Sequence, residues 1–425
     1  DMRKILTLAM LTVLTGCATR QNPEAAEPLV QTTEPFTIAV LPDTQFYCDT
    51  RHKLADAWGN GDLRRYFFAQ TEWVRDNQER LNIAFLVHEG DIVQTDAPEE
   101  WAIAKEAMSI LDGTVPYCMC LGNHDMGYEK ADNQYGCNIG VNRTTHFNTY
   151  FPREKFAKRR EFGGTFDPDR HDNSWYHFEA AGMKFMIVAL EYHPRDDVLD
   201  WANKIVAGHP DHRVILLTHA YLKPDQTRTT NQLKLKGNNG EQMWQKFVRK
   251  HQNIFMVLCG HFGGEAVLTS AGDHGNPVHQ ILSDYQGRNN GGESWLRYMV
   301  FQPEANQIGI YTYNPALDKF WDRPSSRFDL DYSMTPSPLT VPEITRPGAA
   351  YEMEQEAGQS PAGVLQSGFG ADRSVVETVS GDVTKRLAPP VVEPLSTDLP
   401  INEMRAGFVK PPSSAKAKVW WHWMN

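Results

Sequence analysis

The first buried strand of the chain is predicted at residues 36–41, which read FTIAVL, and the next four residues read PDTQ (42–45). An unbroken run of apolar and β-branched residues is typical of a strand that is covered on both faces. Asp43 and Gln45 come directly after this run. Because ligands of α/β proteins bind outside the carboxyl ends of strands, these two side chains are candidates for a functional site.

Similar apolar runs alternate with stretches of helical spacing as far as residue 275. Buried strands are predicted at 36–41, 83–87, 115–121, 184–190, 213–217 and 254–258, and helices at 63–81, 99–111, 196–206 and 240–251. This alternation predicts an α/β fold in which helices flank the sheets. An antiparallel part is then predicted from strands at 279–282, 296–301 and 307–313. Residues 143–174 are polar and lack clear periodicity, so they are predicted to form a long loop that is functional or mobile.

Five predicted strands are each followed by side chains that can bind metal or transfer protons. These side chains are Asp43 with Gln45, Asp91, Asn123 with His124 and Asp125, His219, and His261. Each one alone has an ordinary explanation as a helix cap, a turn residue or a buried histidine. Their occurrence at five strand ends predicts one shared metal site. His88 lies within a predicted strand instead, and we interpret it as a core or supporting residue.

The residue types define the chemistry of this predicted site. Carboxylate and amide oxygens combined with neutral imidazole nitrogens suit Mn, Fe, Zn or similar divalent ions. Two such ions about 3.5–4 Å apart can clamp a phosphoryl group and share a bridging hydroxide as nucleophile. Asp91 is the natural bridge, because a carboxylate has two oxygens to share. His124 could donate a proton or contact the phosphoryl oxygens, and Asp125 is expected to orient its ring.

The motifs, taken in order, resemble those of the calcineurin-like metallophosphoesterase superfamily over about residues 36–315. The superfamily pattern is Asp-x-His/Gln, Gly-Asp, Gly-Asn-His-Asp/Glu, a single His after a strand, and Gly-His-x-His. The resemblance implies a four-layer α/β/β/α sandwich with a dinuclear metal site at one sheet edge. It also implies hydrolysis of phosphomonoesters, phosphodiesters or nucleotide anhydrides through attack of metal-bound hydroxide.

The resemblance also implies a role for each matching residue of this chain. It assigns Asp43 and Gln45 to the first ion, Asp91 to the bridge, Asn123, His219 and His261 to the second ion, and His124 to proton donation. The chain departs from the pattern at two positions, because Gln45 replaces a histidine and Gly263 stands where the last histidine is expected. We hypothesise that the first ion therefore binds loosely, prefers a harder metal or recruits a ligand from elsewhere.

Further motifs resemble an exported bacterial branch of the superfamily. They are the LPDTQ motif at 41–45, SDYQ at 283–286 and GGESWLR at 291–297. Candidates for contact with a phosphoryl group are Asn123, Arg143, Arg288 and Arg297, since arginine can bind such groups in a bidentate manner. Tyr285 and Trp295 could stack on an aryl group or a nucleobase, or could belong to the core. Glu191 could reach the edge of the site or precede a helix.

The two ends of the chain differ in composition from the middle. Residues 1–17 combine a basic start, an apolar run and the ending LTGC, which resembles the signal of a bacterial lipoprotein. An exported periplasmic or cell-surface protein, attached to the membrane through a lipidated Cys17, is therefore predicted. Residues 18–35 are predicted to be a linker and 36–330 a metallophosphoesterase catalytic domain. Residues 331–425, which hold 11 of the 26 prolines, are predicted to be a disordered tail.

Composition and charge exclude several other classes of protein. The ordinary contents of hydrophobic residues (41%) and charged residues (22%) exclude a fibrous or wholly disordered chain. The net charge of −11 argues against binding to nucleic-acid duplexes, because phosphate backbones select for a basic surface. No Gly-x-Ser-x-Gly motif occurs, so a serine hydrolase is disfavoured.

Of the cysteines, Cys48 and Cys137 could form a disulfide in an exported protein.

The leading hypothesis from the sequence is a metal-dependent hydrolase of small-molecule phosphate esters. Two alternatives remain open at this stage. The same site could act on sulfate esters or phosphonates, because a pair of ions recognises a tetrahedral oxyanion more than phosphorus itself. The chain could instead be a surface lipoprotein that binds metal without catalysis, as Gln45 and Gly263 would suggest.

Overall fold

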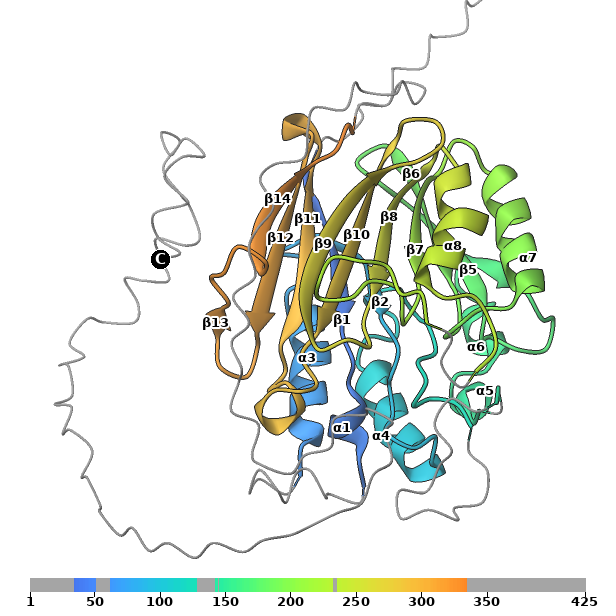
Figure 1. Cartoon of the computed structure of the whole chain (residues 1–425). Helices are drawn as coiled ribbons and strands as arrows, with labels where there is room; N and C mark the ends of the chain where they lie inside the picture. The colour runs from blue at the N-terminus through green and yellow to red at the C-terminus, as the bar shows by residue number, and fades with distance from the viewer. Residues whose placement is uncertain (1–33, 51–61, 128–141, 144, 232–234, 335–425) are drawn as a thin grey trace, which may run out of the picture. The chain divides into compact units, whose positions relative to one another are not determined.

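In the computed structural model of the chain, FTIAVL forms β1 (Phe36–Leu41; Figure 1). All six residues of this strand are buried. The structure describes residues 34–50, 62–127, 142–143, 145–231 and 235–334. The predicted signal at 1–17 with Cys17, nearly all of the linker, the tail from 335 onward and Cys137 lie outside the described residues. The chain divides into two units, Asp1–Ala362 and Gly363–Asn425, and all described residues belong to the first.

The first sheet has seven strands and contains β1 near its middle. The order is β13-β12-β11-β1-β2-β3, and β14 also pairs with β12. The further strands are β2 (Ile83–His88), β3 (Tyr117–Met119), β11 (Leu296–Gln302), β12 (Gln307–Asn314), β13 (Lys319–Phe320) and β14 (Arg327–Asp331). β1, β2 and β3 run parallel, whereas β11 to β14 are antiparallel to their neighbours. The carboxyl ends of the three parallel strands therefore lie at one edge.

The second sheet also has seven strands, in the order β4-β5-β6-β7-β8-β10-β9. These are β4 (Phe162–Thr165), β5 (Ser174–Ala180), β6 (Met183–Ala189), β7 (Arg213–Leu217), β8 (Ile254–Cys259), β9 (Gly264–Ala271) and β10 (Pro277–Asp284). β6, β7, β8 and β10 are parallel, so this sheet also brings several carboxyl ends to one edge.

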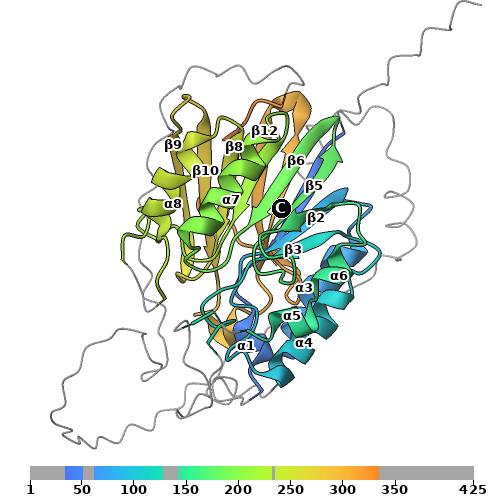
Figure 2. The same cartoon turned by 90° about the vertical axis from the view of Figure 1, so that its right-hand side faces the viewer.

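Helices cover the outer faces of the two sheets. Their bounds are α1 (Gln45–Cys48), α3 (Arg64–Asp76), α4 (Pro98–Ser109), α5 (Phe147–Tyr150), α6 (Arg153–Phe156), α7 (Asp196–Ala207) and α8 (Gly240–Lys246), with 3₁₀ turns η1 (Val248–Lys250), η2 (Asn289–Gly291) and η3 (Pro303–Ala305). Figure 2 shows α7 and α8 over the second sheet and α3 to α6 on the side of β2 and β3. None of the helices formed by the described residues is long and apolar enough to cross a bilayer.

The alternation of side chains along the strands builds these layers. In β7, Val214 and Leu216 pack in a cluster with apolar residues of α7 and α8, whereas Ile215 and Leu217 belong to the core between the sheets. Aromatic rings meet across that core, for example Phe36 of β1 and Phe185 of β6, whose ring centroids lie 5.2 Å apart. The result is the predicted four-layer α/β/β/α sandwich with two mixed sheets.

Local sequence explains where several elements begin and end. Asn239 forms a capping box with Gln242 at the start of α8, so the helix begins there. The helix predicted at 240–251 ends early, because Phe247 leaves helical geometry and a 3₁₀ turn follows. The strand predicted at 115–121 is only three residues long. Pro116 has no N–H to donate, although its carbonyl still accepts a hydrogen bond from the backbone N–H of Leu86 at 2.9 Å.

Three parts of the sequence prediction are corrected by the structure. The region 143–174, predicted to be one irregular loop, contains α5, α6 and β4. β5 and β9 were not predicted, and β10 extends two residues beyond each end of the strand predicted at 279–282. The extra residues at the carboxyl end are the polar pair Ser283 and Asp284, which are both buried.

A buried ion pair joins the two sheets. Glu265 of β9 and Arg297 of β11 lie 2.6 Å apart, with side chains 6% and 1% exposed. Burial raises the pKa of Glu265, but Arg297 and the nearby hydroxyl groups outweigh it, so the pKa is lowered overall. The hydroxyl donors are those of Tyr285, Thr312, Ser325 and Ser326. The prediction that Arg297 contacts substrate is therefore wrong, because its guanidinium is buried and pairs with Glu265 inside the protein.

We predict that Arg297→Met lowers the free energy of unfolding by about 3–5 kcal/mol, since it leaves a buried carboxylate without its cation. Urea denaturation measures the change. Arg249→Met is the control, because it removes a surface ion pair with Asp273 and should lower the free energy by no more than about 1 kcal/mol. A loss below about 1 kcal/mol in Arg297→Met would contradict the structural role.

Candidate metal centre

Two glycines let the loops after the strands approach one another closely. A Cβ atom added to Gly122 would lie 2.1 Å from Oδ1 of Asp91, and one added to Gly260 would lie 2.1 Å from Oδ1 of Asp43. Both distances are far shorter than any contact between atoms that are not bonded. The glycines of the Gly-Asn-His-Asp and Gly-His motifs are thus required so that carboxylates of other loops can fit against them.

Asp91 and His261 also have unusual backbone geometry. Their φ values are 46° and 74°, in the left-handed region that residues other than glycine seldom adopt. Such strain persists only where the surrounding structure fixes it, and it is common at functional sites. Here it aims two side chains from different sheets at one point.

That point is a cluster formed by Asp91, His219 and His261. One oxygen or nitrogen atom of each side chain lies within 4.8 Å of the others. Nε2 of His219 is 3.2 Å from Oδ1 of Asp91 and 3.1 Å from Nδ1 of His261. Oδ1 of Asn123 is also 3.2 Å from the same Nε2 atom. Four of the side chains predicted from the sequence are therefore brought together.

The hydrogen bonds of His219 indicate what this cluster requires. Its Nδ1 lies 2.8 Å from the carbonyl oxygen of Glu89, so Nδ1–H donates and the neutral ring carries a lone pair on Nε2. That lone pair faces a carboxylate oxygen, an amide oxygen and an imidazole nitrogen. A proton on Nε2 could satisfy one of these three acceptors. A divalent cation could instead contact all three of them together with Nε2 of His219. The donor set therefore fits a divalent metal ion.

The electrostatics of the cluster agree with that conclusion. Burial lowers the pKa of His219, yet Asp91 outweighs this effect and the pKa is raised, so the site attracts positive charge. Burial and the neighbouring His219 lower the pKa of His261 to about 3, which keeps its ring neutral, as a metal ligand must be. For Asp91, burial alone would raise the pKa, but the imidazoles of His219 and His124 hold it below its ordinary value.

Other carboxyl groups are buried beside the cluster, among them Asp43, Glu89 and Asp284. Asp43 accepts a hydrogen bond from the backbone N–H of His261 at 3.1 Å. Burial, followed by the Asp284 carboxylate, raises the pKa of Asp43 well above its ordinary value. Burial raises the pKa of Asp284 to about 6. So many buried carboxylates are unfavourable together unless cations accompany them.

Gln45 is also placed at this edge. Its Nε2 donates to Oδ2 of Asp91 at 3.1 Å, while its Oε1 is buried and has no hydrogen-bond partner among the described residues. An unsatisfied buried carbonyl oxygen costs about 1–3 kcal/mol. A cation next to this oxygen would remove that cost, which fits the position predicted for the first ion.

The structure revises how His124 is oriented. Its Nδ1 lies 2.8 Å from the carbonyl oxygen of Gln94, so this carbonyl, and not Asp125, fixes the ring. Asp125 instead accepts hydrogen bonds from the backbone N–H groups of Val93 (2.9 Å) and Gly122 (2.7 Å). It ties the second loop to the third, and the predicted role of Asp125 in orienting His124 is wrong. The sequence could not reveal this contact, because every residue has a backbone carbonyl and the side chain of Gln94 takes no part in it.

His88 is a supporting residue of the loops after β1 and β2, as interpreted from the sequence. It is fully buried, and its Nε2 lies 2.9 Å from Oγ1 of Thr44. Its Nδ1 accepts a hydrogen bond from the backbone N–H of Gly90 at 3.2 Å. Burial lowers the pKa of His88 to about 3, so the ring is neutral. His88 therefore holds the loops that carry Asp43 and Asp91.

Two residues near the cluster were missed as functional candidates. Asp284 is the last residue of β10, and Gln286 follows it closely. Nε2 of Gln286 lies 3.0 Å from Oδ2 of Asp284 and 3.4 Å from Oδ2 of Asp43. Asp284 comes two residues after the strand predicted at 279–282, as Asp43 does after 36–41, but that strand is predicted to be antiparallel, whereas β10 runs parallel to β8.

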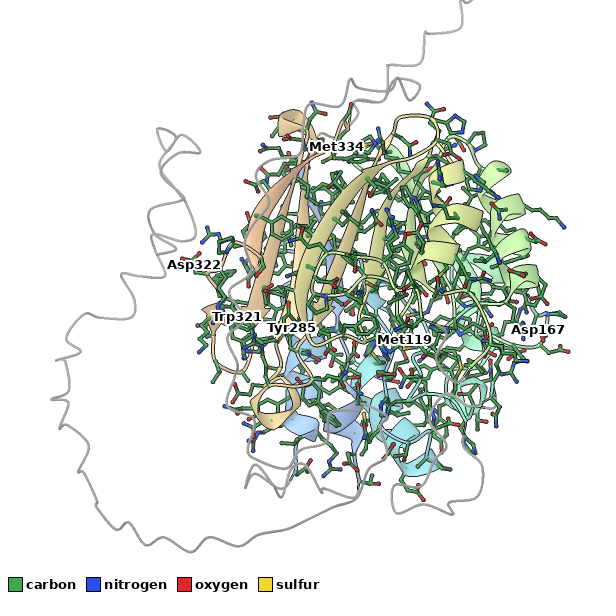
Figure 3. All side chains as sticks on the ribbon, in the orientation of Figure 1. Met119, Asp167, Tyr285, Trp321, Asp322 and Met334 are labelled. Atoms are coloured by element: carbon green, nitrogen blue, oxygen red, sulfur yellow. The ribbon has the colours of Figure 1, made fainter. Side chains whose placement is uncertain are left out.

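The remaining candidates for substrate contact are engaged by other groups of the protein. Arg143 is 3.0 Å from the buried Glu191 and also donates to the carbonyl oxygen of His193. The guanidinium of Arg288 lies 3.5 Å from the ring centroid of Trp321. Trp321 also packs on Trp295, and the buried Tyr285 lies beside it (Figure 3). The two predicted stacking residues thus pack against the protein itself.

Cys48 is buried with a free thiol, as are Cys118, Cys120 and Cys259. The partner suggested for Cys48, Cys137, lies outside the described residues.

We predict that Gly122→Ala weakens Mn²⁺ binding at least about tenfold, because the new methyl group would displace Asp91. Isothermal titration calorimetry measures the affinity. Gly263→Ala is the matched control, since a Cβ there meets no atom within 4 Å and should leave binding unchanged. Equal affinity in Gly122→Ala and the wild type would contradict the role assigned to the close approach.

Comparison with known proteins places this geometry in context. The uncharacterized protein YvnB of Bacillus subtilis (strain 168) is 30% identical over 288 residues, which cover 66% of this chain and 20% of YvnB. The chain thus spans about a fifth of the length of this relative.

Several solved structures are similar at low sequence identity. Purple acid phosphatase PPD1 from yellow lupin (Lupinus luteus) seeds has a TM-score of 0.44 at 13% identity and covers 71% of this chain and 54% of its own. GAP50 of Plasmodium has a TM-score of 0.38 at 10% identity, covering 71% and 89%. The 5′-nucleotidase from Candida albicans SC5314 has a TM-score of 0.35 at 10% identity, covering 72% and 53%.

The sequence profile described as Calcineurin-like phosphoesterase matches residues 36–265, which is more than half of the chain. The matched region begins at β1 and includes Asp91, His219 and His261. The chain therefore belongs to the calcineurin-like phosphoesterase family.

Proposed function

We propose that the protein hydrolyses phosphoric esters, either phosphomonoesters or phosphodiesters, at the centre formed by Asp43, Asp91, His219 and His261. The observation that carries this proposal is the convergence of three acceptor atoms, from Asp91, Asn123 and His261, around Nε2 of His219. Divalent ions bound there would polarise a phosphoryl oxygen and lower the pKa of a water molecule.

His124 is proposed as the group that protonates the leaving oxygen. Its backbone N–H donates to Oδ1 of Asp91 at 2.9 Å, so the residue is fixed next to the cluster. Because the carbonyl oxygen of Gln94 accepts a hydrogen bond from Nδ1–H, Nε2 is the atom that exchanges a proton with substrate. The ring is only partly buried, which leaves it accessible from solvent.

A pocket beside the cluster supports a small organic substrate. Ala220 and Phe262, which directly follow His219 and His261 in the chain, form part of its wall. The full lining is His193, Ala220, Lys223, Thr229, Thr230, Asn231 and Phe262. This mixture of apolar and hydrogen-bonding side chains suits the organic part of an ester.

The location of the protein is part of the proposal. The basic start, the apolar run and the LTGC ending support export and attachment to the membrane through Cys17. The substrate would then be an ester that is present in the periplasm or at the cell surface.

We predict that His124→Asn lowers kcat by about 10²- to 10⁴-fold while the metal content of the protein stays unchanged. The assay uses p-nitrophenyl phosphate and bis-p-nitrophenyl phosphate with added Mn²⁺, and elemental analysis gives the metal content. His212→Asn is the control, because His212 pairs with Asp211 at the surface and should leave kcat as it is.

Three results would count against this function. Failure of the wild-type protein to turn over either phosphate ester with any divalent metal would contradict catalysis on phosphoric esters. Turnover of p-nitrophenyl sulfate alone would identify a sulfate-ester hydrolase. Equal rates in His124→Asn and the wild type would remove His124 from the reaction.

A further inference from the structure

The first ion of the family pattern lacks two imidazoles in this chain. Gln45 stands in place of one histidine and Gly263 in place of the other. The structure shows a further carboxylate at the same edge, within the SDYQ motif, to which the five-motif pattern of the superfamily assigns no role. It belongs to Asp284, the last residue of β10, which runs parallel to β8 and ends beside the loop that carries His261.

Asp284 faces Asp43 across a single amide group. Nε2 of Gln286 lies 3.0 Å from Oδ2 of Asp284 and 3.4 Å from Oδ2 of Asp43. Both carboxylates are at most 2% exposed. Two buried carboxylates so close together repel each other, and one neutral amide that donates to both offsets the repulsion only in part.

Gln45 provides an independent sign that a ligand is missing here. Its side chain is 1% exposed, and Oε1 is buried without a hydrogen-bond partner among the described residues. Nε2 of the same amide donates to Oδ2 of Asp91, whereas Oδ1 of Asp91 faces His219. The two oxygens of Asp91 therefore face different neighbours, Oδ1 an imidazole nitrogen and Oδ2 the side-chain amide of Gln45.

We propose that Asp284 replaces the missing histidine as a ligand of the first ion. This ion would be held by oxygen atoms of Asp43, Asp91, Asp284 and Gln45, with no imidazole. Carboxylate and carbonyl oxygens suit Mg²⁺, Mn²⁺ or Ca²⁺, whereas the site of His219 and His261 suits Zn²⁺ or Fe²⁺. The two sites of this chain thus select different metals.

The inference rests on the proposed function only in that both place cations at this edge, and its tests measure metal content and stability. Asp284→Asn is the informative variant, because Asn keeps an oxygen that can accept the hydrogen bond from the backbone N–H of Gln286. We expect full-length wild-type protein, dialysed against Zn²⁺ and Mn²⁺, to hold one ion of each. Asp284→Asn should keep Zn²⁺ and bind Mn²⁺ at least about 100-fold more weakly.

Thermal unfolding separates a ligand from a structural residue. Mn²⁺ should raise the Tm of the wild type, since a ligand that binds only the folded state stabilises it, and should hardly change the Tm of Asp284→Asn. The metal-free variant should unfold at the same temperature as the metal-free wild type or higher, because one of two facing carboxylates has been neutralised. A purely structural Asp284 would instead give a lower Tm without metal and an unchanged response to Mn²⁺, which would overturn the inference.

Two further variants complete the test. His219→Gln should lose Zn²⁺ and keep Mn²⁺, which is the reverse of Asp284→Asn. Asp273→Asn, which removes a surface carboxylate paired with Arg249, should bind both metals as the wild type does. Retention of both ions by Asp284→Asn, or a wild type that holds only one ion, would overturn the inference. A protein that holds both ions but hydrolyses no ester would overturn only the proposed function.

Discussion

The functional edge of this protein depends on buried acceptor atoms that face one another. Nε2 of His219 is surrounded by atoms of Asp91, Asn123 and His261, and none of these supplies the positive charge that the group requires. The loops that carry them come from both sheets. A cation at this point would therefore join the two sheets as well as provide chemistry, in the same way that structural metal sites contribute to folding.

A buried carboxylate away from the functional edge is compensated in a different way. Glu265 is also buried between the sheets, but Arg297 and several hydroxyl groups compensate its charge. At the functional edge, Asp43 and Asp284 share only the amide of Gln286. One buried carboxylate is thus neutralised by the chain itself, whereas the others are left for an external cation. This contrast explains why Arg297 stabilises the fold and does not serve the site.

Much of the fold and the core of the site could be predicted from the sequence. Apolar runs marked the parallel strands, and the polar residues behind them identified Asp91, His219 and His261, because strand ends converge at one edge. Residue type could not reveal that a carbonyl orients His124 or that Arg297 pairs with Glu265, since these contacts depend on packing between distant segments. Asp284 escaped notice because an antiparallel part is expected after residue 275, whereas β10 runs parallel to β8 and so ends at the functional edge.

The most direct test of the account is a crystal structure of the protein soaked in Mn²⁺ and Zn²⁺, with anomalous diffraction measured at both absorption edges. We predict a zinc peak about 2.0–2.1 Å from Nε2 of His219. A manganese peak should lie beside it, within bonding distance of Asp43 and Asp284. The absence of any anomalous peak near His219, with its Nε2 hydrogen-bonded to Asp91 instead, would contradict the claim that these side chains are arranged around cations.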